Sequence, residues 1–197
     1  LNTQINETTV DKVANLLVNE SKLTVAVCNA NSLVRASKNN RINKVLNAFD
    51  ICTPDGFPVA LASRLLYKNG QKRVDGFNLF KKTLEISENK EVTHYFFGNK
   101  EEVVMKIINK FEKSNPNTQI IGYVCPPYLE IDELLDEQYI KEIIEIQPSI
   151  VWVSLGFPKQ ELFINELKNK YNFNSNLVGI GFTFDWISGT KFKAPEI

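Results

Sequence analysis

The sequence predicts an α/β fold of Rossmann-like type, a single domain in which helices cover both faces of a mainly parallel sheet. From Leu23 onward, short apolar runs alternate with amphipathic stretches, and alternation of this kind is typical of parallel sheets. A chain of 197 residues is short enough for one core, so we expect one domain over residues 1–197. Hydrophobic residues make up 43% and charged residues 23%, which excludes disordered, collagenous and coiled-coil classes.

The elements can be assigned in order along the chain. Six apolar runs predict strands: Leu23–Cys28, Phe49–Thr53, Thr93–Phe97, Gln119–Val124, Ile150–Leu155 and Leu177–Gly181. The stretches between them predict helices: Asn31–Asn47, Pro58–Tyr67, Phe77–Glu88, Lys100–Lys113, Gln138–Glu145 and Pro158–Tyr171. Within 100–113, for example, Val103, Val104 and Ile107 recur at the helical period and mark one buried face.

Charge and hydropathy exclude several classes of partner. The chain has 23 basic and 23 acidic residues, so no global positive field draws it to nucleic acid. The longest strongly apolar run, Ile150–Phe157, is far shorter than the ~20 residues that a membrane-spanning helix requires. The segment Leu1–Val10 lacks the basic and apolar parts of a secretory signal, so we expect a cytoplasmic location.

Motifs for metals and cofactors are also missing from the sequence. The cysteines are few and widely spaced, which predicts reduced thiols: Cys28, Cys52 and Cys125. His94, the only histidine, lies in a predicted strand, where we expect a core residue and not a metal ligand or a member of a Ser-His-Asp triad. Gly179-Ile-Gly181 is no dinucleotide motif because Phe184 stands at the third glycine position, and neither a P-loop nor an EF-hand occurs. We therefore expect no metal and no cofactor.

The residues that follow the predicted strands carry most of the chemistry. In a parallel sheet the ligand crevice lies beyond the carboxyl ends of the strands, so these residues should share one rim. They are Asn29-Ala-Asn31, Pro54-Asp55-Gly56, Gly98-Asn99-Lys100, Cys125-Pro-Pro-Tyr128, Gly156-Phe-Pro-Lys-Gln-Glu161 and Phe182-Thr-Phe-Asp185. The rim would gather amides, carboxylates, a lysine, a glutamine and several aromatic rings.

Asp55 permits two interpretations. Thr53-Pro-Asp-Gly56 is good turn chemistry, and Asp55 could simply cap the helix that follows. An aspartate exposed on a short turn at the rim could instead act as a general base toward a hydroxyl. Its removal would then cost ~10²–10⁴ in rate, far more than the loss of a cap.

Two basic residues are candidates for binding phosphate. Lys159 lies in the first turn of a predicted helix, where a cation opposes the helix dipole and calls for either an anionic ligand or Glu161 as its partner. Arg73 lies in the charged segment 72–76, for which a solvated cluster is the ordinary explanation. Its guanidinium could instead hold two phosphate oxygens at once.

Five segments together carry a more specific signal than any one of them. They are Asn29-Ala-Asn31, Thr53-Pro-Asp-Gly56, Lys72-Arg-Val-Asp-Gly-Phe-Asn-Leu79, Leu155-Gly-Phe-Pro-Lys-Gln-Glu161 and Gly179-Ile-Gly-Phe-Thr-Phe-Asp-Trp-Ile-Ser-Gly189. In this order and at these intervals they resemble the WecG/TagA/CpsF family of bacterial glycosyltransferases, from about Leu23 to the end. The resemblance implies metal-independent, inverting transfer of a sugar, often of the N-acetylmannosamine type. The donor would be a UDP-sugar and the acceptor a polyprenyl-diphosphate-linked saccharide, in the synthesis of cell-surface polymers.

The resemblance also implies roles for individual residues. Asp55 matches the proposed base that deprotonates the acceptor hydroxyl, and Arg73 and Gln160 match residues expected at the active site, so these three are the expected catalytic residues. Asp185 matches an aspartate that we expect near the nucleotide. With the other rim groups it completes the expected substrate-binding set: Asn29, Asn31, Thr53, Gly98, Tyr128, Phe157, Lys159 and Asp185.

Membrane contact is expected outside this chain. Members of the family continue into a basic, amphipathic appendage that docks on the membrane, whereas this sequence stops at Lys193-Ala-Pro-Glu-Ile197. We expect an enzyme peripheral to the inner face of the plasma membrane, with assembly into a homo-oligomer left open. The alternative is a non-catalytic module that binds a nucleotide sugar or phosphate on the same rim, with Asp55 as a helix cap.

Overall fold

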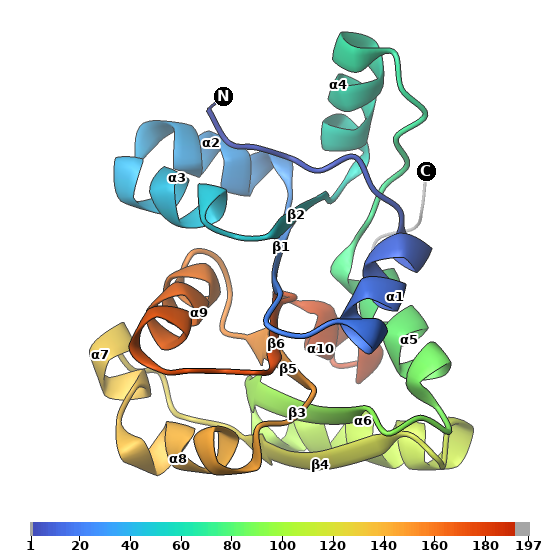
Figure 1. Cartoon of the computed structure of the whole chain (residues 1–197), viewed down its shortest axis with the longest axis vertical. Coiled ribbons are helices and arrows are strands. Elements are labelled where there is room, and N and C mark those ends of the chain that lie inside the picture. The colour runs from blue at the N-terminus through green and yellow to red at the C-terminus, as the bar shows by residue number, and fades with distance from the viewer. Residues whose placement is uncertain (1, 192–197) are drawn as a thin grey trace.

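The computed structural model describes residues 2–191 and contains a six-stranded sheet in which every neighbouring pair of strands is parallel (Figure 1). The strands are β1 (Thr24–Cys28), β2 (Ile51–Pro54), β3 (Thr93–Gly98), β4 (Gln119–Val124), β5 (Ile150–Ser154) and β6 (Asn176–Gly179). Their order in the sheet is β2-β1-β6-β5-β3-β4. The predicted Rossmann-like α/β class is confirmed.

The helices are α1 (Val10–Asn19), α2 (Ala30–Lys38), α3 (Asn40–Asn47), α4 (Phe57–Tyr67), α5 (Gly76–Ser87), α6 (Glu101–Ser114), α7 (Ile131–Leu134), α8 (Glu137–Ile146), α9 (Lys159–Lys170) and α10 (Thr183–Ile187). One helix predicted over 31–47 is wrong, because the chain breaks at Asn39. The Asn39 side chain accepts hydrogen bonds from the N–H groups of Arg41 and Ile42 and so starts α3. Three helices, α1, α7 and α10, were not predicted. No helix within residues 2–191 has the length and apolar character needed to cross a membrane.

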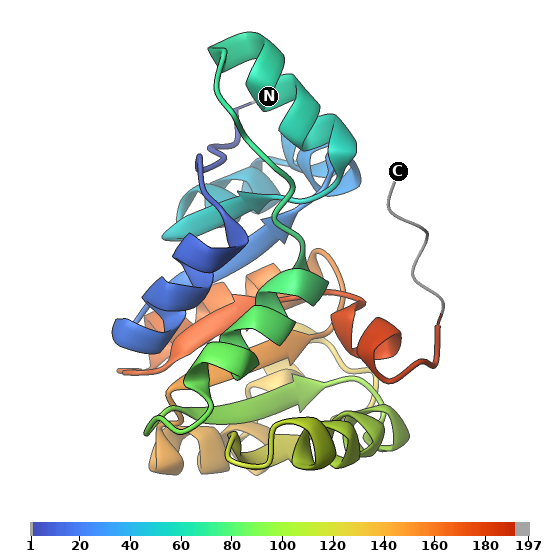
Figure 2. The ribbon, with the colours of Figure 1, turned by 90° about the vertical axis from the view of Figure 1, so that its right-hand side faces the viewer.

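Helices cover both faces of the sheet, because side chains alternate along each buried strand. Phe97 packs on the face covered by α2, α3, α7, α8 and α9, where its ring stacks on Phe163 with centroids 4.5 Å apart. Trp152 packs on the face covered by α1, α5, α6 and α10, where its ring lies 4.8 Å from that of Phe80. Val59 of helix α4 packs into the core on the Phe97 face, and the rest of this helix extends beyond the sheet (Figures 1 and 2).

His94 is a core residue, as the sequence predicts. Trp152 Nε1 donates to His94 Nδ1 at 3.1 Å, and His94 Nε2 lies 2.8 Å from Ser87 Oγ. Burial lowers the pKa of His94 to about 3, so the ring stays neutral. The cysteines carry free thiols, also as predicted.

An extended N-terminal segment, residues 2–9, begins beside α3 and then passes the edge strand β2. The Asn6 N–H donates to Cys52 O at 2.9 Å, and the Cys52 N–H donates to Asn6 Oδ1 at 2.7 Å. The same segment holds the buried side chain of Gln71, which accepts from the Thr8 N–H at 2.9 Å and donates to Thr8 O at 2.7 Å. The chain before the first strand therefore fastens the connection between α4 and α5.

Candidate active site

The carboxyl ends of the strands face one side of the molecule, where α10 and the base of α4 also lie (Figure 2). Asp55 follows β2 at this rim, and its N–H donates to Cys28 O, at the end of β1, at 2.9 Å. Its side chain is only 15% exposed, so the expectation of an exposed carboxylate is wrong. Asp55 is also no cap for α4, because the N-cap of that helix is Gly56 and no side chain caps it. The interpretation of Asp55 as a helix cap is therefore excluded.

The segment before α5 runs beside the end of β2. The Val74 N–H donates to Pro54 O at 2.9 Å, and Thr53 Oγ1 donates to Val74 O at 2.9 Å. Thr53 is thus buried and tethers this segment to the strand, although it was expected to contact substrate. These two bonds hold Arg73 against Asp55.

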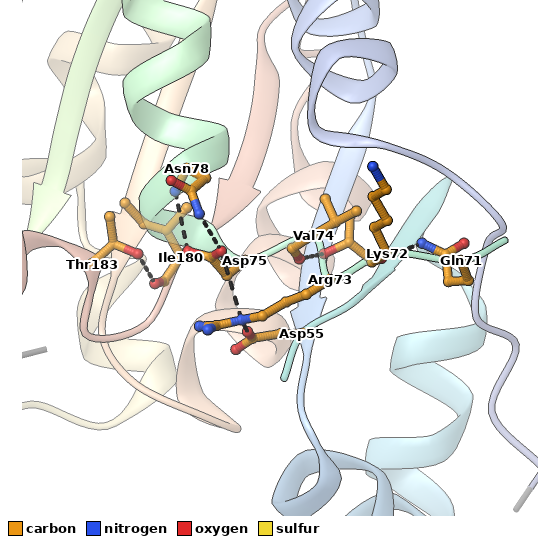
Figure 3. Close-up of polar contacts among 10 residues, drawn as sticks. Asp55, Gln71, Lys72, Arg73, Val74, Asp75, Asn78, Ile180 and Thr183 are labelled. Carbon is orange, nitrogen blue, oxygen red and sulfur yellow. Dashed lines mark hydrogen bonds and ion pairs between the residues drawn. The ribbon is translucent and has the colours of Figure 1, made fainter. Parts of the chain in front are cut away.

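Asp55, Arg73 and Asp75 form a cluster that we call the carboxylate–arginine cluster (Figure 3). Arg73 Nε lies 3.2 Å from Asp55 Oδ1 and 3.6 Å from Asp75 Oδ2. The Arg73 side chain is 33% exposed, so the expectation of a solvated charge cluster does not describe it. Asp75 is buried, and it caps α5 by accepting from the Asn78 N–H at 3.1 Å. Sequence reasoning missed Asp75, although an Asp-Gly pair before an apolar helix is a recognisable cap signal.

Burial and charge oppose each other at Asp55. Burial raises the pKa of the Asp55 carboxyl, because the ionised form loses water, while the adjacent Arg73 guanidinium lowers it. The nearby Asp75 carboxylate raises it again. The arrangement suits a carboxylate that is a stronger base than a solvated one and is still paired with a cation.

The cluster is fixed against the turn between β6 and α10. Gly76, the first residue of α5, packs so closely there that an added Cβ would lie 2.5 Å from Thr183 Oγ1 and 3.1 Å from Ile180 O. Thr183 Oγ1 in turn donates to Ile180 O at 2.7 Å (Figure 3). Only glycine fits this contact, so the Asp-Gly pair serves both the cap and the close approach.

A second polar group surrounds Asp185, which lies at the rim as predicted. Asn99 Nδ2 donates to Asp185 Oδ2 at 3.1 Å, and Lys191 Nζ lies 3.4 Å from Asp185 Oδ1. Neither partner was among the predicted site residues. Gly98 just before Asn99 is buried with φ at 97°, and a Cβ there would lie 2.7 Å from Ser154 O. Packing against β5 therefore explains this glycine without a ligand. Lys193, the other basic residue near this end, lies outside the described residues.

Gln160 lies at the rim with its side chain turned inward. Its Oε1 accepts from the Gly181 N–H at 3.0 Å, and its Nε2 donates to Glu161 Oε1 at 2.8 Å. Both polar ends of the amide are thus used within the protein, between α9 and the turn after β6. Burial raises the pKa of Glu161 to about 7. Glu161 contacts Gln160 in the interior, so of the two partners considered for Lys159 the structure does not support Glu161.

Lys159 and Tyr128 follow β5 and β4 and lie on the part of the rim away from Asp55. Lys159 Nζ donates to Leu129 O at 2.6 Å and lies 3.6 Å from the ring centroid of the exposed Tyr128. A carbonyl and an aromatic face therefore receive this cation. In the part of the chain that the structure describes, no hydrogen bond or ion pair joins Lys159 to Asp55 or Arg73.

Helix α2 contributes its first turn and a cation to the same side. The exposed Asn29 caps this helix by accepting from the Ser32 N–H at 3.0 Å, and Asn31 is exposed beside it. Arg35 Nη1 donates to Phe157 O at 3.3 Å, and its guanidinium carbon lies 5.1 Å from the Phe157 ring centroid. Arg35 was not predicted, because one arginine on a helix surface has no distinguishing sequence signal. Among residues 2–191, no group of three or more His, Cys, Asp or Glu side chains is arranged to hold a metal ion.

Comparison with known proteins gives the family. The model of the glycosyl transferase WecG/TagA/CpsF family matches residues 1–197. An N-acetylglucosaminyldiphosphoundecaprenol N-acetyl-beta-D-mannosaminyltransferase of Bacillus spizizenii is 31% identical over 161 residues, which are 82% of this chain and 60% of that protein. Proteins of the same name in Bacillus subtilis and Staphylococcus aureus are 29% and 25% identical, over 87% and 95% of this chain and 65% and 72% of their own length. The chain thus spans less than two thirds of the two Bacillus relatives. The match over its whole length means that the chain belongs to the WecG/TagA/CpsF family of glycosyl transferases.

Proposed function

We propose that this chain is a glycosyltransferase that moves a sugar of the N-acetylmannosamine type from a UDP-sugar to a polyprenyl-diphosphate-linked saccharide. Family membership and the names of the relatives support the reaction class and this kind of acceptor. The observation that carries the proposal is the pairing of Asp55 with Arg73 at the carboxyl edge of the sheet. A base and a diphosphate-binding cation are the two groups that such a transfer needs.

The proposed step is a single displacement with inversion. The acceptor hydroxyl oxygen attacks the anomeric carbon while the bond from that carbon to the diphosphate oxygen breaks. Asp55 takes the hydroxyl proton, and UDP leaves with the bonding electron pair. Arg73 offsets the charge that develops on the diphosphate, as guanidinium groups do at phosphoryl oxygens, so that no metal ion is required.

The other residues support this step in different ways. Gln160 acts through the Gly181 N–H and so positions the turn after β6. Asn29, Asn31 and Asp185 are proposed to contact substrate. The acceptor is anchored in a bilayer by its prenyl chain, so the enzyme works in the cytoplasm at the inner face of the plasma membrane.

The test is substitution of Asp55 by Asn, with UDP release measured from UDP-N-acetylmannosamine and a short-chain soluble acceptor. We expect kcat to fall by ~10²–10⁴ while UDP affinity is retained, because the proton acceptor is lost and the shape is kept. Asp11→Asn, at an exposed side chain of α1, is the matched control and should turn over normally. Normal turnover by Asp55→Asn would remove Asp55 as the base. UDP binding without turnover in the unaltered chain would favour the non-catalytic module.

A further inference from the structure

Helix α4 exposes large apolar side chains, which are uncommon as a group on a surface that faces only water. Phe57, Leu65, Leu66 and Tyr67 are between 58% and 75% exposed, and we call these four residues the α4 apolar surface. Single exposed apolar residues are ordinary, but four on one helix of 11 residues, three of them consecutive, usually mark a contact with another apolar phase.

The helix has little to pack against within the described residues. Within α4 only Val59 and Ala60 are buried, Val59 in the core on the Phe97 face of the sheet, and the rest of the helix extends away from the sheet (Figures 1 and 2). A helix that is apolar on most sides is typically covered on more than one of them. All four side chains of the α4 apolar surface are mostly exposed, and the Phe57 ring is covered in part by the Arg64 guanidinium, whose carbon lies 5.8 Å from the ring centroid.

The charge around this surface indicates what covers it. Residues 56–74 contain four basic side chains and no acidic one, although the whole chain is neutral. Arg73 is paired with Asp55, but Arg64, Lys68 and Lys72 are exposed. Apolar and aromatic side chains flanked by cations are the composition that binds the interface of an anionic bilayer. A second copy fits less well, because a twofold contact would set the same cations against each other.

We propose that α4 docks on an anionic lipid surface, with Leu65, Leu66 and Tyr67 inserted among the head groups. The purpose of this contact rests on the proposed function, since a polyprenyl-linked acceptor would lie in that bilayer. Helix α4 begins two residues after Asp55, so docking would bring the base close to the head groups.

The first test is sedimentation with vesicles of phosphatidylcholine and phosphatidylglycerol, and with phosphatidylcholine vesicles alone. The chain should bind the anionic vesicles selectively, and Leu65→Ser/Leu66→Ser should weaken binding at least about tenfold, because two leucines no longer leave water. Met105→Ser/Ile146→Ser is the matched control. It removes two exposed apolar side chains of α6 and α8, and should bind as the unaltered chain does.

Charge-reversal variants distinguish electrostatic attraction to anionic lipid from non-specific hydrophobic adsorption. Lys68→Glu/Lys72→Glu should weaken binding to anionic vesicles, and Lys106→Glu/Lys113→Glu, with the same change on α6, should not. If the unaltered chain fails to bind anionic vesicles, or if the leucine variant binds them equally well, the proposal is overturned. It is also overturned if light scattering shows a dimer that the leucine variant dissociates, because the occupant would then be a second copy.

Activity distinguishes this proposal from the proposed function. Vesicle binding requires no turnover, so a chain that binds anionic vesicles but transfers no sugar contradicts only the function. With an active chain, Leu65→Ser/Leu66→Ser should keep its rate on a short-chain soluble acceptor and lose rate on the same acceptor embedded in anionic vesicles. Equal loss on both acceptors would show that the helix supports the site directly, and would contradict docking.

Discussion

Arg73 should set the pH range in which Asp55 can act as a base. Arg73 Nε lies 3.2 Å from Asp55 Oδ1, and an opposite charge this close favours the ionised carboxylate and so lowers its pKa. Because the Arg73 side chain is 33% exposed, water screens part of this interaction. Replacing Arg73 by Gln removes this charge, so the pKa of Asp55, already raised by burial, should rise further.

The sign of the effect on activity follows from the role of the base. Asp55 accepts a proton only when it is ionised, so the acid limb of the kcat profile should move to higher pH in Arg73→Gln. The level of kcat should also fall at every pH, because Arg73 is proposed to contact the diphosphate. The pH at which the acid limb lies, and not the height of the kcat profile, therefore reports on the ion pair between Arg73 and Asp55.

A second substitution should move the limb the other way. Asp75 raises the pKa of Asp55, so Asp75→Asn should shift the acid limb to lower pH, while Asn still caps α5. The assay is UDP release at saturating donor and soluble acceptor between about pH 3 and pH 9, a range that spans the ordinary carboxyl and histidine pKa values. A limb that stays in place in Arg73→Gln, or that moves to lower pH, would refute the electrostatic reasoning.

Three further results are expected. Burial raises the pKa of Glu161 to about 7 from its ordinary 4.5, so the protein loses folding stability as the pH rises through this range and the buried carboxyl ionises. In Glu161→Gln, the free energy of unfolding measured in urea should therefore be higher than in the unaltered chain by about 1–3 kcal/mol at pH ~8 and little changed at pH ~4. Gly98→Ala should lower the free energy of unfolding by about 1–3 kcal/mol more than Gly156→Ala. Both glycines have positive φ, but only at Gly98 would the added Cβ clash with Ser154 O, so equal losses would contradict the steric explanation. EDTA should leave sugar transfer intact, because cationic side chains are proposed to offset the diphosphate charge, and activity restored by magnesium or manganese after chelation would contradict this.

The sequence was most informative about the strands and the rim. Buried parallel strands read as nearly continuous apolar runs, so 119–124 was predicted to the residue and 150–155 to within one residue. The rim positions of Asp55 and Asp185 followed from the same reading. The single helix over 31–47 failed because the Asn39 side chain competes with the helix by capping a new one, a choice that periodicity does not reveal.

Contacts between distant segments could not be predicted. The proximity of Arg73 to Asp55 depends on the backbone pairing of Val74 with Pro54, and that pairing is invisible before the path of the chain is known. The same holds for Gln160, whose partner Gly181 lies 21 residues further along the chain. Residue type and spacing gave the chemistry of these side chains, whereas their burial and orientation came from tertiary packing.

The N-terminal segment beside β2 has a consequence for how the protein can be shortened. An uncovered edge strand offers unpaired backbone groups to other chains and promotes aggregation, and Asn6 occupies part of that edge. Thr8 in the same segment holds Gln71, two residues before Arg73. Deleting the first nine residues would therefore expose the edge of β2, which favours aggregation, and would free the loop that holds Arg73. An activity assay alone would not distinguish these two defects.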